Sequence, residues 1–252
     1  MTTAMVTGPT AGIGLRFAHH LAGRGHDLVL VARDEARLDA VAAELRTTHG
    51  VEVEVLPADL GDRDQLARVE ARLADTGRPV DLLVNNAGFG LKRRFLDNDV
   101  AAEQAMLDVL VVAVMRLSHA ALTGMSARGH GGLINVSSVA AYLPRGTYAA
   151  AKAWVNSFGA WLAAEYAHAD LRVMTLCPGF TRTEFHRRMD VRSGSARSLL
   201  WLDADFVVTR ALADYDRGRH LSVPGAQYRT VVALTRLIPT RVLQAFQSLG
   251  RR

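Results

Sequence analysis

Residues 4–14 read Ala-Met-Val-Thr-Gly-Pro-Thr-Ala-Gly-Ile-Gly, a short apolar run that leads into a glycine-rich turn and then an amphipathic stretch. Gly8, Gly12 and Gly14 permit a tight turn and a close approach of the backbone to a ligand. A strand, turn and helix in this order put a helix N-terminus where the pyrophosphate of a dinucleotide would bind. The G-x-x-x-G-x-G spacing differs from the commoner G-x-G-x-x-G. Taken alone, this turn also fits a strand-to-helix connection without a ligand.

The same alternation of short apolar runs and amphipathic stretches continues along the chain. The first predicted helix, residues 13–24, stops at Gly25. Further strands are predicted at 28–32, 51–56, 80–84, 133–136, 173–176 and 221–223, and further helices at 34–48, 62–75 (with Asp62 as N-cap), 99–128, 149–167 and 203–216. Continuous apolar strands separated by helices indicate a parallel sheet covered on both faces. We therefore predict one α/β domain over residues 1–252, a doubly wound Rossmann-like sheet with ligands beyond the carboxyl ends of its strands.

Composition narrows the class of protein. The chain has 252 residues, 49% hydrophobic and 22% charged, which excludes collagen-like and wholly disordered proteins. The formal charge is +5, but the arginines are dispersed among acidic residues, and the nearest approach to a basic run is Lys92-Arg93-Arg94. We therefore expect no nucleic-acid partner. Only two of the 30 basic residues are lysines, Lys92 and Lys152, a bias that a GC-rich bacterial genome would produce.

The single cysteine, Cys177, excludes an intramolecular disulfide and a cysteine-rich metal site, and we predict no metal. It is expected to be a small buried residue rather than a nucleophile. The N-terminal sequence MTTAMVTG has no signal-peptide pattern. The longest apolar stretch, residues 107–115, contains an aspartate and is too short to span a bilayer. These observations favour a cytoplasmic location.

Several strand ends carry candidate cofactor ligands. Arg33 ends the second strand, where NAD-binding folds place an acidic residue for the ribose, and a guanidinium there would bind the 2′-phosphate of NADP. The next residue, Asp34, could still accept from the ribose. Asp59 and Leu60 follow the third strand and are candidates for contact with the adenine. The fourth strand ends in Asn85-Asn86-Ala87-Gly88, in which the glycine leaves room for a flat ring.

The most specific signal combines a strand end with the next helix. Ser137 and Ser138 end one strand, and Tyr148 and Lys152 share a face of the following helix because they are four residues apart. We expect the ammonium and a cationic nicotinamide to lower the pKa of the tyrosine. The phenol could then protonate an alkoxide as hydride arrives, with a serine hydroxyl holding the carbonyl oxygen. A core tyrosine beside a solvated lysine is the alternative interpretation.

Pro178 and Gly179 turn the chain sharply after the sixth strand, and Thr181 and Thr183 follow as candidate ligands of a carboxamide. Together, these motifs resemble the short-chain dehydrogenase/reductase family, from Val6 to Phe185, and in particular its NADP-dependent carbonyl and ketoacyl reductases. The resemblance implies seven strands and a catalytic set of Ser138, Tyr148 and Lys152, with Lys152 also binding the nicotinamide ribose. The implied NADP(H) ligands are Gly8, Thr10, Gly12, Ile13, Gly14, Arg33, Asp59, Leu60, Asn86, Ala87, Gly88, Tyr148, Lys152, Pro178, Gly179, Thr181 and Thr183.

Two features depart from the family. Leu110 stands where the family usually has an asparagine that helps to hold a water for proton relay. Leucine cannot form that hydrogen bond, so the relay must be rerouted or lost. The segment between Ser138 and Tyr148 is shorter than usual, which leaves the choice between Ser137 and Ser138 open, although alignment of the motif favours Ser138.

Residues 185–200 match the variable substrate lid of the family. They mix arginines with apolar residues, and Lys92, Arg93 and Arg94 lie between two phenylalanines on another loop at the same sheet edge. An apolar pocket with a basic rim suits a hydrophobic ketone, such as a 3-oxoacyl chain on a phosphate-bearing carrier, unless the arginines are only solvated. The tail, residues 226–252, predicts a helical extension that packs on a partner subunit or the lid, or contacts an anionic membrane.

The sequence therefore predicts a homo-oligomeric, NADPH-dependent reductase of a hydrophobic ketone. A non-catalytic NADP-binding sensor or scaffold is the alternative, and Leu110 is the feature that favours it. An epimerase or dehydratase of the related extended fold would also use Tyr-x-x-x-Lys, but this chain is short for the additional substrate domain.

Overall fold

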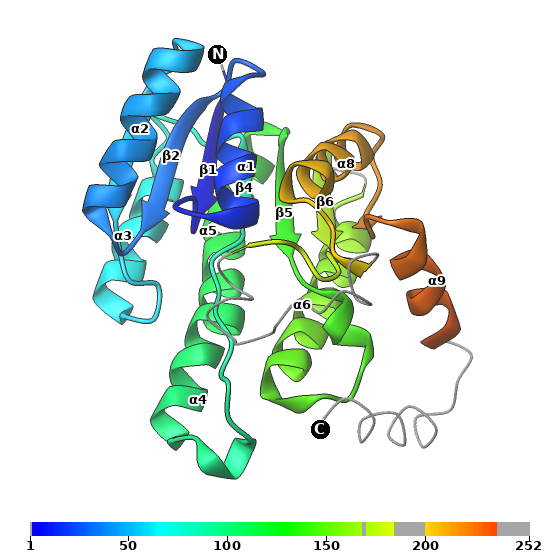
Figure 1. Cartoon of the computed structure of the whole chain (residues 1–252). Coiled ribbons are helices and arrows are strands. Elements are labelled where there is room, and N and C mark those ends of the chain that lie inside the picture. The colour runs from blue at the N-terminus through cyan, green and yellow to red at the C-terminus, as the bar shows by residue number, and fades with distance from the viewer. Residues whose placement is uncertain (1, 168–169, 184–199, 236–252) are drawn as a thin grey trace.

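Seven parallel strands form the centre of the computed structural model, which describes residues 2–167, 170–183 and 200–235 (Figure 1). The sheet order is β3-β2-β1-β4-β5-β6-β7. The strands are β1 (Thr3–Thr7), β2 (Asp27–Ala32), β3 (Val53–Pro57), β4 (Leu82–Asn85), β5 (Gly131–Val136), β6 (Leu171–Leu176) and β7 (Leu221–Ser222). The order reverses between β1 and β4, which creates the crevice where doubly wound sheets bind ligands. The predicted fold class is confirmed.

Helices cover both faces of the sheet. They are α1 (Gly12–Ala22), α2 (Glu35–His49), α3 (Arg63–Ala74), α4 (Val100–Leu107), α5 (Ala113–Arg128), α6 (Gly146–Glu165), α8 (Ala204–Asp216) and α9 (Ala226–Thr235), with shorter η1 (Phe95–Asp97), η2 (Asp108–Val112) and η3 (Val139–Tyr142). Val6 packs in one buried cluster with residues of α1, α2 and α8. Its neighbour Met5 packs in a second cluster with residues of α3, α5 and α6. Alternate side chains thus enter opposite layers, which explains why the strands are apolar throughout.

Local signals set most helix starts, and several predicted bounds were wrong. Asp62 caps α3 as predicted and accepts hydrogen bonds from the backbone N–H groups of Asp64 and Gln65. The first helix ends at Ala22, not next to Gly25. Helix α6 begins at Gly146, before the predicted start, so Tyr148 lies in its first turn.

The segment predicted as one helix over 99–128 is divided by the π-helical turn η2 between α4 and α5. Among the described residues, the stretch Val100–Arg128 is long and apolar enough to cross a membrane by length and composition. Half of its most apolar window is buried, and Leu117 and Leu122 of α5 lie in the cluster that covers one face of the sheet. Its packing is that of a core helix.

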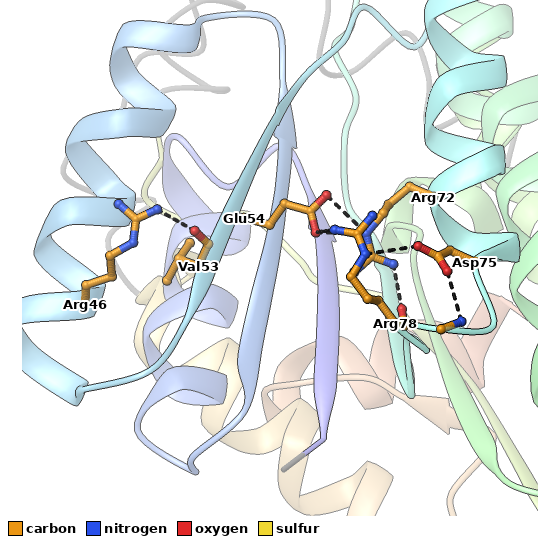
Figure 2. Close-up of polar contacts among 7 residues, drawn as sticks. Arg46, Val53, Glu54, Arg72, Asp75 and Arg78 are labelled. Atoms are coloured by element: carbon orange, nitrogen blue, oxygen red, sulfur yellow. Dashed lines mark hydrogen bonds and ion pairs between the residues drawn. The ribbon is translucent and has the colours of Figure 1, made fainter.

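Charged side chains connect the edge strand β3 to the helices α2 and α3 (Figure 2). Arg72 of α3 is buried, and its Nε donates to both carboxylate oxygens of Glu54, at 3.1 and 2.8 Å. Its Nη1 donates to the carbonyl of Arg78 at 2.7 Å, and Arg46 of α2 donates to the carbonyl of Val53. A buried guanidinium with these partners holds α3 on the outermost strand. The loop after β3, which carries Asp59, is thereby positioned at the crevice.

Candidate active site

A cavity of about 1690 Å³ opens at the carboxyl ends of the strands. Pockets for small ligands are typically roughly 300–1,000 Å³, so this cavity is larger than most of them. All the catalytic and NADP(H)-binding residues that the resemblance implies line it except Gly14. The topology thus brings segments from six strand ends to one site, and Gly14 contributes packing within the glycine-rich loop.

The glycine-rich loop is interlocked with the end of β4. Gly8 and Gly12 have φ values of +67° and +57°. A Cβ on Gly14 would lie 2.2 Å from the carbonyl oxygen of Gly8 and 2.4 Å from Nδ2 of Asn86. That Nδ2 donates to the carbonyls of Thr7, at 2.9 Å, and Gly8, at 3.1 Å. Gly14 therefore serves packing inside the loop, and Asn86 fixes the loop as well as lining the cavity.

The N-terminus of α1 is open to an anion. Its N-cap residue, Ala11, makes no side-chain cap hydrogen bond and lines the cavity together with Thr10 and Ile13. Backbone N–H groups in a first helical turn have no partners within the helix, and they carry the positive end of the helix dipole. This arrangement fits the pyrophosphate that the sequence predicts here.

Arg33 lies at the far end of the cavity. Its Nη1 is 3.8 Å from Oδ2 of Asp59, and both side chains are exposed, by 69% and 41%. Asp34, considered above as a ribose ligand, lines the cavity and also caps α2, where its Oδ1 accepts from the N–H of Arg37 at 3.1 Å. Arg37 itself also lines the cavity. Sequence reasoning missed Arg37, although its place one turn after Arg33 was a usable signal.

Ser138, Tyr148 and Lys152 meet at the other end. Nζ of Lys152 lies 5.9 Å from the centroid of the Tyr148 ring and donates to the carbonyl of Val136 at 2.7 Å. Ser138 forms a side-chain hydrogen bond with Tyr148. The neighbouring Ser137 is buried, and its hydroxyl donates to the carbonyl of Lys152 at 2.9 Å. The geometry therefore favours Ser138 as the serine that faces a substrate and Ser137 as a support for α6.

Burial controls the protonation of this group. Desolvation raises the pKa of Tyr148 to about 12, and the hydrogen bond with Ser138 offsets only part of that effect. Desolvation lowers the pKa of Lys152 to about 8. The expected lowering of the tyrosine pKa depends on a bound cationic nicotinamide and stays a prediction; without it, desolvation shifts the pKa of Tyr148 upward. The physical reason is that a low-dielectric site disfavours the charged form of each group, which outweighs their proximity.

Leu110 lies beside this group. Its side chain is fully buried on η2, in a cluster with Met106 and Ala151 against which Tyr148 packs. A Cβ on Gly88 would be 2.6 Å from Cδ2 of Leu110 and 4.0 Å from Nζ of Lys152. Gly88 thus leaves space that a larger residue would close. The leucine supplies apolar packing next to the phenol where the family usually has a polar side chain.

The segment after β6 forms the remaining wall. Gly179 packs on Tyr228 of α9, because a Cβ on this glycine would be 2.1 Å from the ring. The phenol of Tyr228 accepts from the N–H of Phe180 at 3.0 Å and donates to the carbonyl of Leu200. The hydroxyl of Thr181 donates to the carbonyl of Gly179 at 3.0 Å, so only its oxygen remains to accept from a ligand. Sequence reasoning missed Tyr228, which carried no motif.

The side chain of Thr183 lies next to the glycine-rich loop, since a Cβ on Gly12 would be 2.8 Å from its Cγ2. Cys177 is buried, and desolvation raises the pKa of its thiol to about 11, which agrees with an inert core residue. Among the described residues no group of three or more His, Cys, Asp or Glu could hold a metal ion. The predicted lid lies outside the described residues except for Leu200, as does the tail beyond residue 235.

Comparisons with known proteins identify the family of this chain. The model of the short chain dehydrogenase family matches residues 2–192. An uncharacterized oxidoreductase of Mycobacterium tuberculosis, Rv0945, is 32% identical over 249 residues, 96% of each chain. The very-long-chain 3-oxoacyl-CoA reductase of Anas platyrhynchos is 34% identical over 193 residues, 73% of this chain and 61% of that protein. A short-chain dehydrogenase from Sphingobium yanoikuyae, solved in complex with NADPH, superposes with a TM-score of 0.85 at 33% identity over 94% of each chain. The chain therefore belongs to the short-chain dehydrogenase/reductase family of oxidoreductases.

Proposed function

We propose that this oxidoreductase uses NADPH to reduce a ketone that carries an acyl or similar apolar chain. The observation that carries the proposal is the shape of the cavity. Tyr148, Lys152 and Ser138 lie at one end, and Arg33 lies at the other, beyond the open N-terminus of α1.

The residues at the Arg33 end fit NADP. An NAD-specific site needs a carboxylate at the end of β2 to accept from the ribose 2′-hydroxyl. Here that position holds a guanidinium, and the adjacent Asp34 is engaged as the cap of α2. Arg33 and Arg37 would hold a 2′-phosphate through charge-assisted hydrogen bonds. The NADPH bound to the Sphingobium yanoikuyae relative supports this assignment.

When bound, NADPH supplies the hydride that adds to the carbonyl carbon. Ser138 then donates a hydrogen bond to the carbonyl oxygen, and Tyr148 transfers its proton to that oxygen as the alcohol forms. A phenol of ordinary pKa near ~10 already keeps its proton at neutral pH, and desolvation raises the pKa of Tyr148 further, to about 12, so the proton donor of the reduction is in its protonated form. Lys152, anchored on the carbonyl of Val136, would hold the nicotinamide ribose.

The cavity walls suggest the class of ketone. Apolar side chains from four segments line it, namely Phe89, Leu91, Met106, Leu143 and Trp201. Lys92, Arg93, Arg94 and Arg145 line it as well, and all four are exposed. An apolar interior with cations at its rim suits a 3-oxoacyl chain on an anionic carrier. The 3-oxoacyl-CoA reductase among the relatives supports this class.

Loss of NADPH absorbance with a panel of carbonyl compounds tests the proposal. We expect kcat/KM for a long-chain 3-oxoacyl-CoA to exceed that for a short neutral ketone at least about 100-fold, because each buried methylene contributes ~0.8 kcal/mol. The matched saturated acyl-CoA, which lacks the ketone, should give no oxidation. Equal or faster reduction of the short ketone would contradict the acyl-chain assignment.

A sensor or scaffold that binds NADP without turnover is the second candidate, and the apolar Leu110 beside Tyr148 is the observation that favours it. Binding of NADPH together with no reduction of any carbonyl in the panel would select this candidate.

A further inference from the structure

Three apolar side chains are exposed at the mouth of the cavity. Within six positions, Phe95 is 61% exposed, Leu96 90% and Val100 77%. Phe95 and Leu96 lie on the turn between β4 and α4, and Val100 is the first residue of α4; we call residues 92–100 the 92–100 tip. Figure 1 shows α4 and this turn projecting beyond the sheet at the lower end of the view. Exposed apolar side chains that cluster in this way mark an interaction surface more often than isolated ones do.

Internal hydrogen bonds hold the tip in this conformation. Nδ2 of Asn98 donates to Oε1 of the buried Glu103 at 2.7 Å and to the carbonyl of Arg93 at 3.4 Å. The N–H of Asp97 donates to the carbonyl of Arg94 at 2.9 Å, which closes η1. Asp99 caps α4 by accepting from the N–H of Ala101 at 2.9 Å. The fold therefore presents Phe95 and Leu96 outward on a hydrogen-bonded turn.

Cations surround these apolar side chains. Lys92, Arg93 and Arg94 precede them directly and are all exposed, and Arg145 lies on the rim of the same cavity. Asp97 and Asp99 carry the opposing charge, and Asp99 faces the N-terminus of α4 as its cap. Apolar side chains next to lysine and arginine are typical of segments that insert at the surface of an anionic bilayer.

We propose that the 92–100 tip docks on an anionic membrane and so brings the cavity mouth to the lipid phase. A second protein surface is disfavoured because a stable interface buries about 800 Å² on each partner, which a narrow turn with three apolar side chains does not offer. Insertion into lipid gains free energy from each side chain separately. The benefit of docking, direct entry of a lipid-like ketone, depends on the proposed function, but docking itself does not.

Flotation of the full-length chain with vesicles tests the proposal. We expect the chain to float with phosphatidylcholine vesicles that contain phosphatidylglycerol, to stay behind with phosphatidylcholine alone, and to dissociate at high salt. Phe95→Ser with Leu96→Ser should lower the partition coefficient at least about tenfold, as should Arg93→Glu with Arg94→Glu. The matched controls are Phe206→Ser on α8, where the phenylalanine is 48% exposed, and Arg63→Glu on α3, and both should bind like the unaltered chain.

Failure of the unaltered chain to float with anionic vesicles would overturn the proposal, and so would flotation of the tip variants equal to that of their controls. Equal melting temperatures of variants and controls establish that a loss of flotation is not a loss of folding. If Leu96→Ser instead shifts the size-exclusion volume without any effect of lipid, the tip contacts a second copy and the proposal is wrong. The experiment measures lipid binding, so none of these outcomes tests the reductase assignment.

Discussion

The charged side chains at the two ends of the cavity differ in how far they are exposed to water. At one end, Arg33 and Asp59 are exposed by 69% and 41%, and water screens their charges. At the other, Lys152 is only 4% exposed, and desolvation lowers its pKa and raises that of Tyr148. Under the proposed function, the exposed end would bind the cofactor phosphate by charge. The other end would carry out proton transfer, and its surroundings shift the pKa values of the groups that would do so.

Arg33→Ala tests the exposed end. Loss of a charge-assisted hydrogen bond to the 2′-phosphate should lower kcat/KM for NADPH about 30-fold, while kcat/KM for NADH stays within about twofold. Steady-state kinetics with both cofactors measure the ratio of kcat/KM for NADPH to kcat/KM for NADH. Arg68→Ala is the matched control, because Arg68 lies near Arg33 but donates to the carbonyl of Pro57 at 2.9 Å. An equal loss of kcat/KM with NADPH and NADH after Arg33→Ala would show that Arg33 does not bind the 2′-phosphate.

Lys152→Met tests the buried end. The pKa of Lys152 falls from 10.5 to about 8 on folding, so burial of its charge costs about 3 kcal/mol at neutral pH. The variant also loses the hydrogen bond from the ammonium to the carbonyl of Val136, worth ~2 kcal/mol because its donor is charged. We therefore expect the free energy of unfolding at pH 7 to rise by about 1 kcal/mol, as replacement of a buried active-site group often does.

The pH dependence of this gain follows from linkage. Between pH 8 and 10 the unfolded chain holds the Lys152 proton and the folded protein releases it, so the unaltered protein becomes more stable as pH rises. The gain in free energy of unfolding from Lys152→Met should therefore decrease between pH 8 and 10, and urea unfolding at each pH measures it. Lys92→Met, at the exposed lysine, should show no such change. A Lys152→Met advantage that is constant from pH 7 to 10 would contradict the lowered pKa.

Much of the fold was predictable because its signals are local. Apolar strands, the cap at Asp62 and the glycine-rich turn each depend on a few neighbouring residues. Parallel strands all end at the same edge of the sheet. For this reason Arg33, Asn86 and Tyr148 could be assigned to one cavity from the sequence alone.

The remaining features depend on contacts between distant segments. The packing of Gly14 on Asn86, the support of Gly179 by Tyr228, and the engagement of Ser137 with Lys152 join residues that no local pattern connects. The upward pKa shift of Tyr148 without a nicotinamide could not be predicted from the sequence for a related reason. Spacing shows that Lys152 shares its helix face, but only the surrounding packing shows how strongly the site is desolvated. Location, oligomeric state and a role of the tail stay predictions.

Tyr148→Phe tests the central claim most directly, because it removes one oxygen atom from the buried end and leaves the exposed end intact. We expect NADPH to bind with a Kd within about twofold of the unaltered protein, since the ligands near Arg33 and α1 are unchanged. Turnover of the best ketone in the panel should fall to background at every pH tested. Reduction that persists in this variant, with NADPH bound, would contradict the assignment of Tyr148 as the proton donor.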